Sequence, residues 1–295
     1  MNELKLINWL RSLKGQKDFD LGDDAAYLPP MGKRGTLWTT DILIENVHFT
    51  RKQAMHSWGH KAIMVNASDI AAMGGAPKWA LVSMGIPTRF TLNDVKNIYK
   101  GIKKASAEFD IRIIGGDTCR SKAIVLSIAM GGLPGKHILS RKGAKPGDYV
   151  FVSGPLGDSL KSGHHLNFKA RVDEAIFLND CYHPSSMMDV SDGLSKDLMA
   201  IAHESQVGFE LNEAAIPLRN KTASVNKAFE DGEDFELLFT LSPKKSLELI
   251  SDKRVVGLGF NFFPMGSIKD QSKGYKLRGV NGKIKKIPEH KDHHF

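Results

Sequence analysis

The carboxylates of this 295-residue sequence gather beside glycine, serine and threonine at the ends of apolar runs. Taken singly, such clusters are ordinary, because Asp-Gly pairs form turns and Ser or Asp begins helices. Taken together they predict more, because carboxylates on converging strand ends repel one another by about 4 kcal/mol per close pair at an effective dielectric constant of about 20. The clusters are Gly22-Asp23-Asp24, Thr39-Thr40-Asp41, Ser68-Asp69, Gly115-Gly116-Asp117, Asp189-Val190-Ser191-Asp192-Gly193 and Gly232-Glu233-Asp234.

Divalent cations are the simplest source of the positive charge that these clusters need, because lysine and arginine are sparse within them. Ligand sets made only of oxygen favour Mg²⁺, Mn²⁺ or Ca²⁺ over softer metals. Mg²⁺ usually binds through a few carboxylates together with phosphate oxygens of a substrate. Glycines such as Gly115 and Gly116 would let the backbone approach a phosphate closely. The clusters therefore predict a site for a metal-phosphate complex.

The common nucleotide and hydrolase signatures are absent from the sequence. It contains no GxxxxGK[ST], no GxGxxG after a strand, no HRD and DFG pair, no HExxH and no GxSxG. An ATP site must therefore be built in another way. Ser191 is expected to cap a helix carrying Leu194 and Leu198, whose free N–H groups would attract a phosphate. Arg141 is expected to clamp a nucleotide phosphate.

Hydrophobic patterning predicts a mixture of strands and helices in both halves of the chain. Glycine and proline in RKGAKPGD, residues 141–148, interrupt two well-patterned regions. We therefore expect an α/β or α+β fold with domains at 1–140 and 141–295. Helices are predicted at 4–13, 58–73, 92–108 and from Ser191 onward, and strands at 36–44, 78–86, 111–116, 123–132, 148–154 and 235–241.

Charge and hydropathy exclude several classes of function. Residues 243–295 hold twelve Lys or Arg against five Asp or Glu. These charges alternate with apolar residues around a turn expected at Asn281-Gly282, which favours a solvated β-hairpin over a nucleic-acid interface. No apolar run reaches the roughly 18–20 residues of a membrane span. Two distant cysteines, Cys119 and Cys181, suit a reducing compartment, so a cytoplasmic location is expected.

Seven linked motifs, from about Asp20 to Leu238, resemble those of the thiamine-monophosphate kinase family, within the superfamily of aminoimidazole ribonucleotide synthetase. The resemblance implies a two-domain fold, with an N-terminal domain that pairs with its copy in a shared β-barrel. A homodimer is implied by the same analogy. The motifs are LGDDAA, TTDILIENVHF, VNASDIAAMGGAPKWAL, IIGGDT, RKGAKPGDYVFVSG, DVSDGLSKDL and GEDFELLF.

The resemblance also implies roles for individual residues, with Mg²⁺ as cofactor and ATP as co-substrate; a contribution from K⁺ stays open. The implied metal-binding set is Asp24, Thr39, Thr40, Asp41, Asp69, Asp117, Asp189 and Asp192. The residues expected to contact ATP are Phe109, Gly116, Asp117, Arg141 and Ser191. The acceptor, thiamine monophosphate, would contact His48 and Glu233. At the C-terminus, His294 and Phe295 match the family, whereas Asp292 stands where it has an aromatic residue.

The implied reaction is a direct in-line attack of the acceptor phosphate on the γ-phosphorus of ATP, without a phosphoenzyme. The acceptor is already an anion at neutral pH, so no residue is expected to act as a general acid or base. Two alternatives remain at this stage. One is another ATP-dependent member of the superfamily, such as aminoimidazole ribonucleotide synthetase. The other is a non-catalytic sensor of nucleotide and thiamine phosphate.

Overall fold

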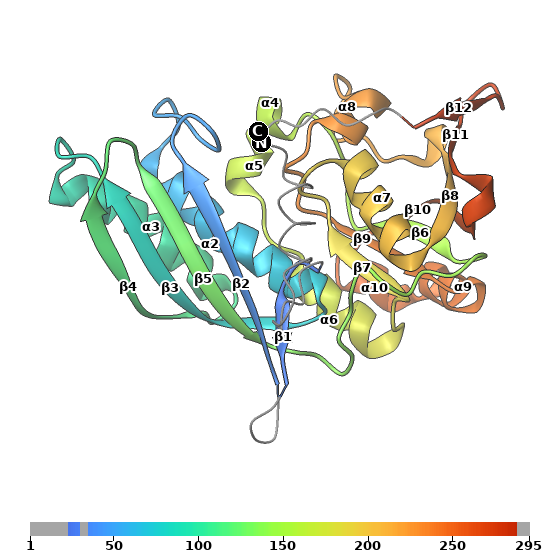
Figure 1. Cartoon of the computed structure of the whole chain (residues 1–295), viewed down its shortest axis with the longest axis horizontal. Coiled ribbons are helices and arrows are strands. Elements are labelled where there is room, and N and C mark those ends of the chain that lie inside the picture. The colour runs from blue at the N-terminus through green and yellow to red at the C-terminus, as the bar shows by residue number, and fades with distance from the viewer. Residues whose placement is uncertain (1–22, 30–34, 288–295) are drawn as a thin grey trace, which may run out of the picture.

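The computed structural model describes residues 23–29 and 35–287 and consists of two lobes, each built on one β-sheet (Figure 1). The first lobe contains the sheet of residues 26–133, and the second contains the sheet of residues 149–286. The helix predicted at 4–13 and the C-terminal positions Asp292, His294 and Phe295 lie outside the described residues. The fold class predicted from the sequence, a mixture of α and β structure in both halves, is confirmed.

The first sheet has five strands in the order β1-β2-β5-β3-β4. Neighbouring strands are antiparallel except for β3 and β4, which are parallel. Because β4 ends this order, its outer edge has no strand partner among the described residues. The bounds are β1 Ala26–Leu28, β2 Thr36–Ile44, β3 Ala76–Ile86, β4 Arg112–Arg120 and β5 Val125–Leu133.

Two helices, α2 (Met55–Ala72) and α3 (Leu92–Glu108), pack against one face of this sheet (Figure 1). Residues of β2 alternate accordingly: Leu37 and Leu43 are buried beneath the helices, whereas Ile42 between them is 50% exposed on the other face. Helix α3 begins with a capping box, in which the Thr91 hydroxyl accepts from the Asp94 amide and the Asp94 carboxylate accepts from the Thr91 amide. The open face of the sheet is therefore partly apolar.

The second sheet has seven strands in the order β12-β11-β8-β10-β6-β9-β7. The hairpin expected at Asn281-Gly282 is confirmed, since β11 and β12 pair antiparallel on either side of it. The strands are β6 Tyr149–Val152, β7 Ser186–Asp189, β8 Val207–Asn212, β9 Leu237–Leu241, β10 Phe263–Asp270, β11 Tyr275–Arg278 and β12 Ile284–Lys286. The helices are α4 Ser159–Ser162, α5 His164–Asn167, α6 Val172–Cys181, α7 Leu194–Ser205, α8 Val225–Glu230, α9 Pro243–Ser251 and α10 Lys253–Gly257.

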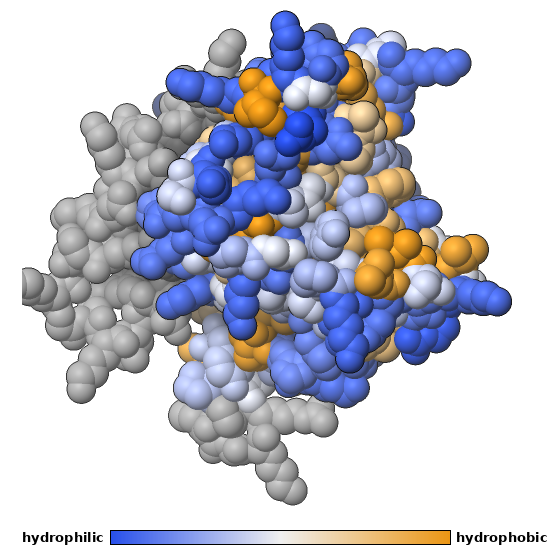
Figure 2. Space-filling view, turned by 90° about the vertical axis from the view of Figure 1, so that its right-hand side faces the viewer, coloured by the Kyte–Doolittle hydropathy of each residue, from blue (hydrophilic) through white to orange (hydrophobic). Residues whose placement is uncertain are grey.

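The surface of the second lobe that carries the C-terminal hairpin is mostly hydrophilic, with separate hydrophobic patches (Figure 2). All three residues of β12 are exposed. Ion pairs hold two basic residues of this hairpin, Arg278 of β11 to Glu210 at 2.8 Å and Lys285 of β12 to Glu213 at 2.9 Å. The basic charge of this region is thus spread over a solvated strand face.

One hydrophobic core runs through both lobes. Met64 of α2 shares it with Phe168 and Phe235 of the second lobe, whose rings stack with centroids 4.3 Å apart. The predicted boundary at residue 140 falls in the segment between β5 and β6, and the division into two domains stays a prediction. Among the described residues, none of the helices combines the length and apolar character that a bilayer crossing requires.

We predict that Gly101→Ala destabilises the protein, because α2 and α3 approach each other through their glycines. A Cβ at Gly101 would lie 1.7 Å from the His56 carbonyl oxygen, so the helices would have to move apart. Overpacking of this kind costs about 1–3 kcal/mol, which a lower thermal unfolding midpoint would report. Gly257→Ala is the matched control, because a Cβ there meets nothing within 4 Å. Equal midpoints for the two variants would contradict the prediction.

Candidate functional site

Three carboxylates from distant parts of the chain meet where the two lobes join. Asp24 precedes β1, Asp69 lies on α2, and Asp189 ends β7. One oxygen atom of each lies within 4.8 Å of one oxygen atom of each of the others. We call these three residues the acid cluster. Its members come from both lobes, so the cluster exists only when the lobes are packed together.

Side chains from β2 and α2 surround the acid cluster. The Thr39 hydroxyl donates to Asp69 at 2.6 Å, and the Ser68 hydroxyl donates to Asp189 at 2.5 Å. Asp41, two residues after Thr39, lies on the same face of β2, and its amide donates to the Asn66 side chain at 3.1 Å. The structure therefore brings the predicted residues Thr39, Asp41, Asp69 and Asp189 together, and it adds Asn66, which was not predicted.

Burial and mutual repulsion disfavour the charged forms of these carboxylates. Desolvation raises the pKa of Asp189 to about 8, with the neighbouring Asp24 adding to the effect. Desolvation also raises the pKa of Asp69 well above its usual value, and the charges of Asp41, Asp189 and Asp24 raise it further. The pKa of Asp41 is raised mainly by burial as well. The protein alone therefore supplies too little positive charge to balance these carboxylates.

Arg141 is the predicted residue that supplies part of this charge. Its Nη2 lies 2.7 Å from Asp24 Oδ1, and its backbone amide donates to Asp23 at 2.7 Å. Although burial alone would lower the pKa of Arg141, the adjacent Asp24 raises it above the usual value. The guanidinium lies beside the acid cluster, as a phosphate clamp would require.

Two buried carboxylate oxygens of the acid cluster, Asp24 Oδ2 and Asp189 Oδ1, have no hydrogen-bond partner among the described residues. Buried polar atoms are nearly always paired, so an unpaired carboxylate oxygen points to an ion or water. Oxygen-only ligands with excess negative charge suit a hard divalent cation. The residues present thus fit Mg²⁺.

A second group of polar residues links the lobes beside Asp41. The Lys61 ammonium of α2 donates to both carboxylate oxygens of Glu233, at 2.7 and 2.6 Å, and to the His48 carbonyl oxygen at 3.0 Å. The structure therefore brings the two predicted acceptor residues to one place. Lys61 was not among the predicted site residues, because its only signal in the sequence is a lone lysine within the apolar pattern of α2.

The other acids of the GEDFE segment, residues 232–236, are held by arginines. Arg219 Nη2 lies 2.7 Å from Asp234, and Arg171 contacts both oxygens of Glu236 at 2.7 and 2.9 Å. Neither arginine was among the predicted site residues. Because each acid already has a cation, these pairs anchor the loop rather than bind a metal.

Ser191 and Asp192 lie next to this loop, but their contacts differ from those that the sequence predicted. The helix predicted to be capped by Ser191 begins at Leu194 with Gly193 as its N-cap and without a side-chain cap, so that prediction is wrong. The physical reason is that the Ser191 carbonyl accepts from the Glu233 amide at 2.7 Å, which holds Ser191 against the loop and outside the helix. Asp192 pairs with Lys196 at 2.8 Å.

Asp197 lies next to Asp192 and was not among the predicted site residues. Its carboxylate accepts from the Asp192 amide at 3.2 Å. Burial raises its pKa well above the usual value, and Asp192 and Asp189 raise it further. The acidic character of the site therefore extends from the acid cluster to the start of α7.

Four predicted site residues are not brought to the acid cluster within one chain. Thr40 points to the opposite face of β2 from Thr39 and Asp41, because side chains alternate along a strand. Gly116 and Asp117 lie on the exposed edge strand β4, three strand spacings or about 14 Å from β2. Phe109 ends α3 among core residues, with Lys169 5.3 Å from its ring.

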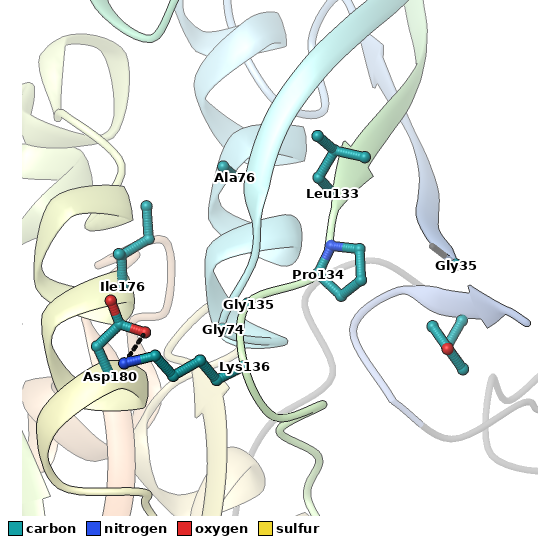
Figure 3. Close-up of a pocket in the computed structure, with 10 residues that line it drawn as sticks. Gly35, Gly74, Ala76, Leu133, Pro134, Gly135, Lys136, Ile176 and Asp180 are labelled. Carbon is teal, nitrogen blue, oxygen red and sulfur yellow. Dashed lines mark ion pairs between the residues drawn. The ribbon is translucent and has the colours of Figure 1, made fainter. Parts of the chain in front are cut away.

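A surface hollow of about 650 Å³ lies elsewhere, in the first lobe and at its border with α6. Figure 3 shows it between Pro134, Gly135 and the Lys136–Asp180 ion pair, with Gly35 on the far side. None of the residues that line it belongs to the acid cluster or contacts Glu233. This hollow is therefore separate from the acid cluster.

Known proteins resemble this chain in sequence and in fold. Residues 22–133 match the model of the AIR synthase related protein N-terminal domain. Thiamine-monophosphate kinase of Aquifex aeolicus is 34% identical over 94% of this chain and 98% of its own length, and that of Bacillus subtilis is 32% identical over 76% and 78%.

Solved structures agree with the sequence comparison. "AaThiL complexed with AMPPCP and TMP" superposes with a TM-score of 0.84 at 30% identity, covering 98% of this chain and 95% of that one. Thiamine-monophosphate kinase from Stenotrophomonas maltophilia gives 0.75 at 27% identity, over 97% and 96%. The agreement extends over nearly the whole length of both chains, and on that basis this chain belongs to the thiamine-monophosphate kinase family.

Proposed function

We propose that this chain transfers the γ-phosphate of ATP to the phosphate of thiamine monophosphate, forming thiamine diphosphate and ADP. The observation that carries the proposal is the acid cluster at the junction of the lobes, beside the Lys61–Glu233 pair. The related AaThiL, complexed with AMPPCP and TMP, supports a site for two phosphate-bearing ligands. Free cysteines suit a cytoplasmic enzyme that uses ATP.

Mg²⁺ is the cofactor that the acid cluster would hold, with Asp24, Asp69 and Asp189 as ligands and Asp41 and Asp192 beside them. Bound there, it would supply the positive charge that neutralises the transferring phosphate groups. The unpaired oxygens of Asp24 and Asp189 support this assignment. Thr39 and Ser68 orient two of the carboxylates through their hydroxyl groups.

The protein's own part in the transfer is to align two phosphates. An oxygen of the acceptor phosphate forms a bond to the γ-phosphorus, and the bond from that phosphorus to the bridging oxygen of ADP breaks. The acceptor is already ionised, so no side chain has to remove a proton. Arg141 would hold a nucleotide phosphate, with Ser191 and Phe109 as further ATP contacts. His48 and Glu233 would bind the acceptor.

A second copy of the chain would complete the site. The open face of the first sheet exposes Ile42 and Leu81, and the edge strand β4 exposes Ile114. An apolar face with a free strand edge is a surface that a partner covers. We propose that two copies join their first lobes in a shared β-barrel, which would carry Gly116 and Asp117 of one copy to the acid cluster of the other.

Asp69→Asn should lower the turnover of thiamine monophosphate at least about 10³-fold, because it removes a charged ligand without changing the side chain's size. Thiamine diphosphate formed with ATP and Mg²⁺ is measured by chromatography. Asp173→Asn, on the exposed face of α6, is the matched control and should keep wild-type turnover. Wild-type protein that binds both ligands without releasing ADP would indicate the sensor alternative instead.

Metal-free protein should lose stability between pH 6.5 and 8. The native pKa of Asp189 is about 8, above the value of about 3.9 expected in the unfolded chain. In this range the native state therefore binds more protons than the unfolded state, so stability falls as pH rises, by up to about 2 kcal/mol for this one group. Thermal unfolding with a chelator measures the loss.

Mg²⁺ should restore the stability lost at pH 8, because it replaces the proton on the acid cluster. Asp189→Asn provides the comparison. Without metal, this variant should show a smaller loss between pH 6.5 and 8 than the wild type, and it should gain less from added Mg²⁺. An unchanged pH dependence in Asp189→Asn would refute the assignment of the effect to this carboxylate.

Mixing two inactive variants tests whether Asp117 acts across a dimer. In a heterodimer of Asp69→Asn and Asp117→Asn subunits, one site would carry both substitutions and the other neither. Random exchange of subunits should therefore restore about a quarter of wild-type activity. If Asp117 serves the acid cluster of its own chain, both sites stay defective and mixing restores nothing.

A further inference from the structure

Lys61 is a fully buried ammonium at the junction of the lobes, with 0% of its surface exposed. An ammonium has three protons to donate, and three acceptors surround this one. Two are the oxygens of Glu233, at 2.7 and 2.6 Å, and the third is the His48 carbonyl at 3.0 Å. All three protons of the Lys61 ammonium are therefore donated to two segments, those of His48 and Glu233, which are the proposed contacts to thiamine monophosphate.

Both segments contain residues in the left-handed backbone conformation, which is unfavourable for any residue other than glycine. Asn46, before His48, has a φ of 67°, and Glu233 and Phe235 have φ values of 54° and 51°. Non-glycine residues in this left-handed region cost roughly 1–2 kcal/mol each, so neighbouring contacts must hold them. Lys61 binds both segments at once and thereby fixes their relative position.

Stability alone does not account for a lysine at this position. The residues around it on α2, such as Ile63 and Met64, are fully buried, and burial lowers the pKa of Lys61 even though Glu233 acts to raise it. Replacing a buried ion pair by apolar side chains is often neutral or stabilising. Methionine at position 61 together with an uncharged residue at position 233 would fill the same space, so the ion pair itself has a use.

Helix α2 also connects Lys61 with the acid cluster. Asp69 follows Lys61 by eight residues, which places the two side chains about 12 Å apart along the helix axis. One rigid element therefore sets the separation between the proposed metal-phosphate end of the site and the end with His48 and Glu233. A displacement of either segment relative to α2 would change that separation.

We propose that Lys61 is the positioning residue for the acceptor: it aligns the His48 and Glu233 segments with each other and, through α2, with the acid cluster. It acts through these residues and does not touch the reacting phosphates. This role rests on the proposed function, since His48 and Glu233 are taken as the contacts to thiamine monophosphate.

Lys61→Met and Lys61→Arg test the role in the full-length protein. For Lys61→Met, we expect the KM for thiamine monophosphate to rise at least about tenfold, with the KM for ATP within about twofold of wild type. Lys61→Arg keeps the charge but has a planar donor geometry, so it should rescue part of the loss. Lys285→Met, which breaks an exposed lysine–glutamate pair, is the matched control and should change neither KM.

Hydrogen exchange of the free protein gives a readout that does not depend on activity. The amides of Asn46, His48 and Glu233 are hydrogen-bonded in the two segments and should exchange at least about tenfold faster in Lys61→Met. A lower melting temperature with both KM values and these amides unchanged would show a merely structural role and overturn the proposal. A wild-type protein inactive on thiamine monophosphate would overturn the proposed function, and the exchange rates would still decide whether Lys61 holds the two segments.

Discussion

Helix α2 carries four polar side chains on which the rest of the site depends: Lys61, Asn66, Ser68 and Asp69. Each contacts a segment distant in sequence, namely the GEDFE loop, β2, β7 and Thr39 of β2. Helix α2 packs against the first sheet and also against α5, α6 and β7 of the second lobe. Its burial between the lobes therefore sets the positions of the strand ends and loops that carry the acids.

The acids of the site differ in how their charge is balanced, and this difference separates the supporting residues from the proposed metal ligands. Glu233, Asp234 and Glu236 each pair with a different cation from elsewhere in the chain. The acid cluster has far less compensation, since Arg141 contacts Asp24 alone and two carboxylate oxygens remain unpaired. Burial makes that imbalance costly, which is why the cluster suits a divalent cation and the GEDFE segment does not need one.

Local patterning was enough to predict most strands and helices of the first lobe. Alternation in TLWTTDILI matches β2 over residues 36–44, and the apolar periodicity at 92–108 matches α3, because both signals come from which side of an element is buried. The start of α7 was misplaced since Ser191 uses its backbone to bind the Glu233 segment. A cap preference is local and weak, whereas that contact joins residues about forty positions apart.

By itself, the sequence determined the ligand chemistry of the site, because residue type sets it: carboxylates and hydroxyls beside small residues bind hard cations and phosphate whatever their exact placement. Only the tertiary structure decided which acids meet. It placed Asp24, Asp69 and Asp189 together, put Asp117 on an edge strand about 14 Å from β2, and showed that Lys61 holds His48 and Glu233. These results depend on strand order and on the packing of α2 between the lobes, and such long-range contacts have no signature in the local pattern of residues.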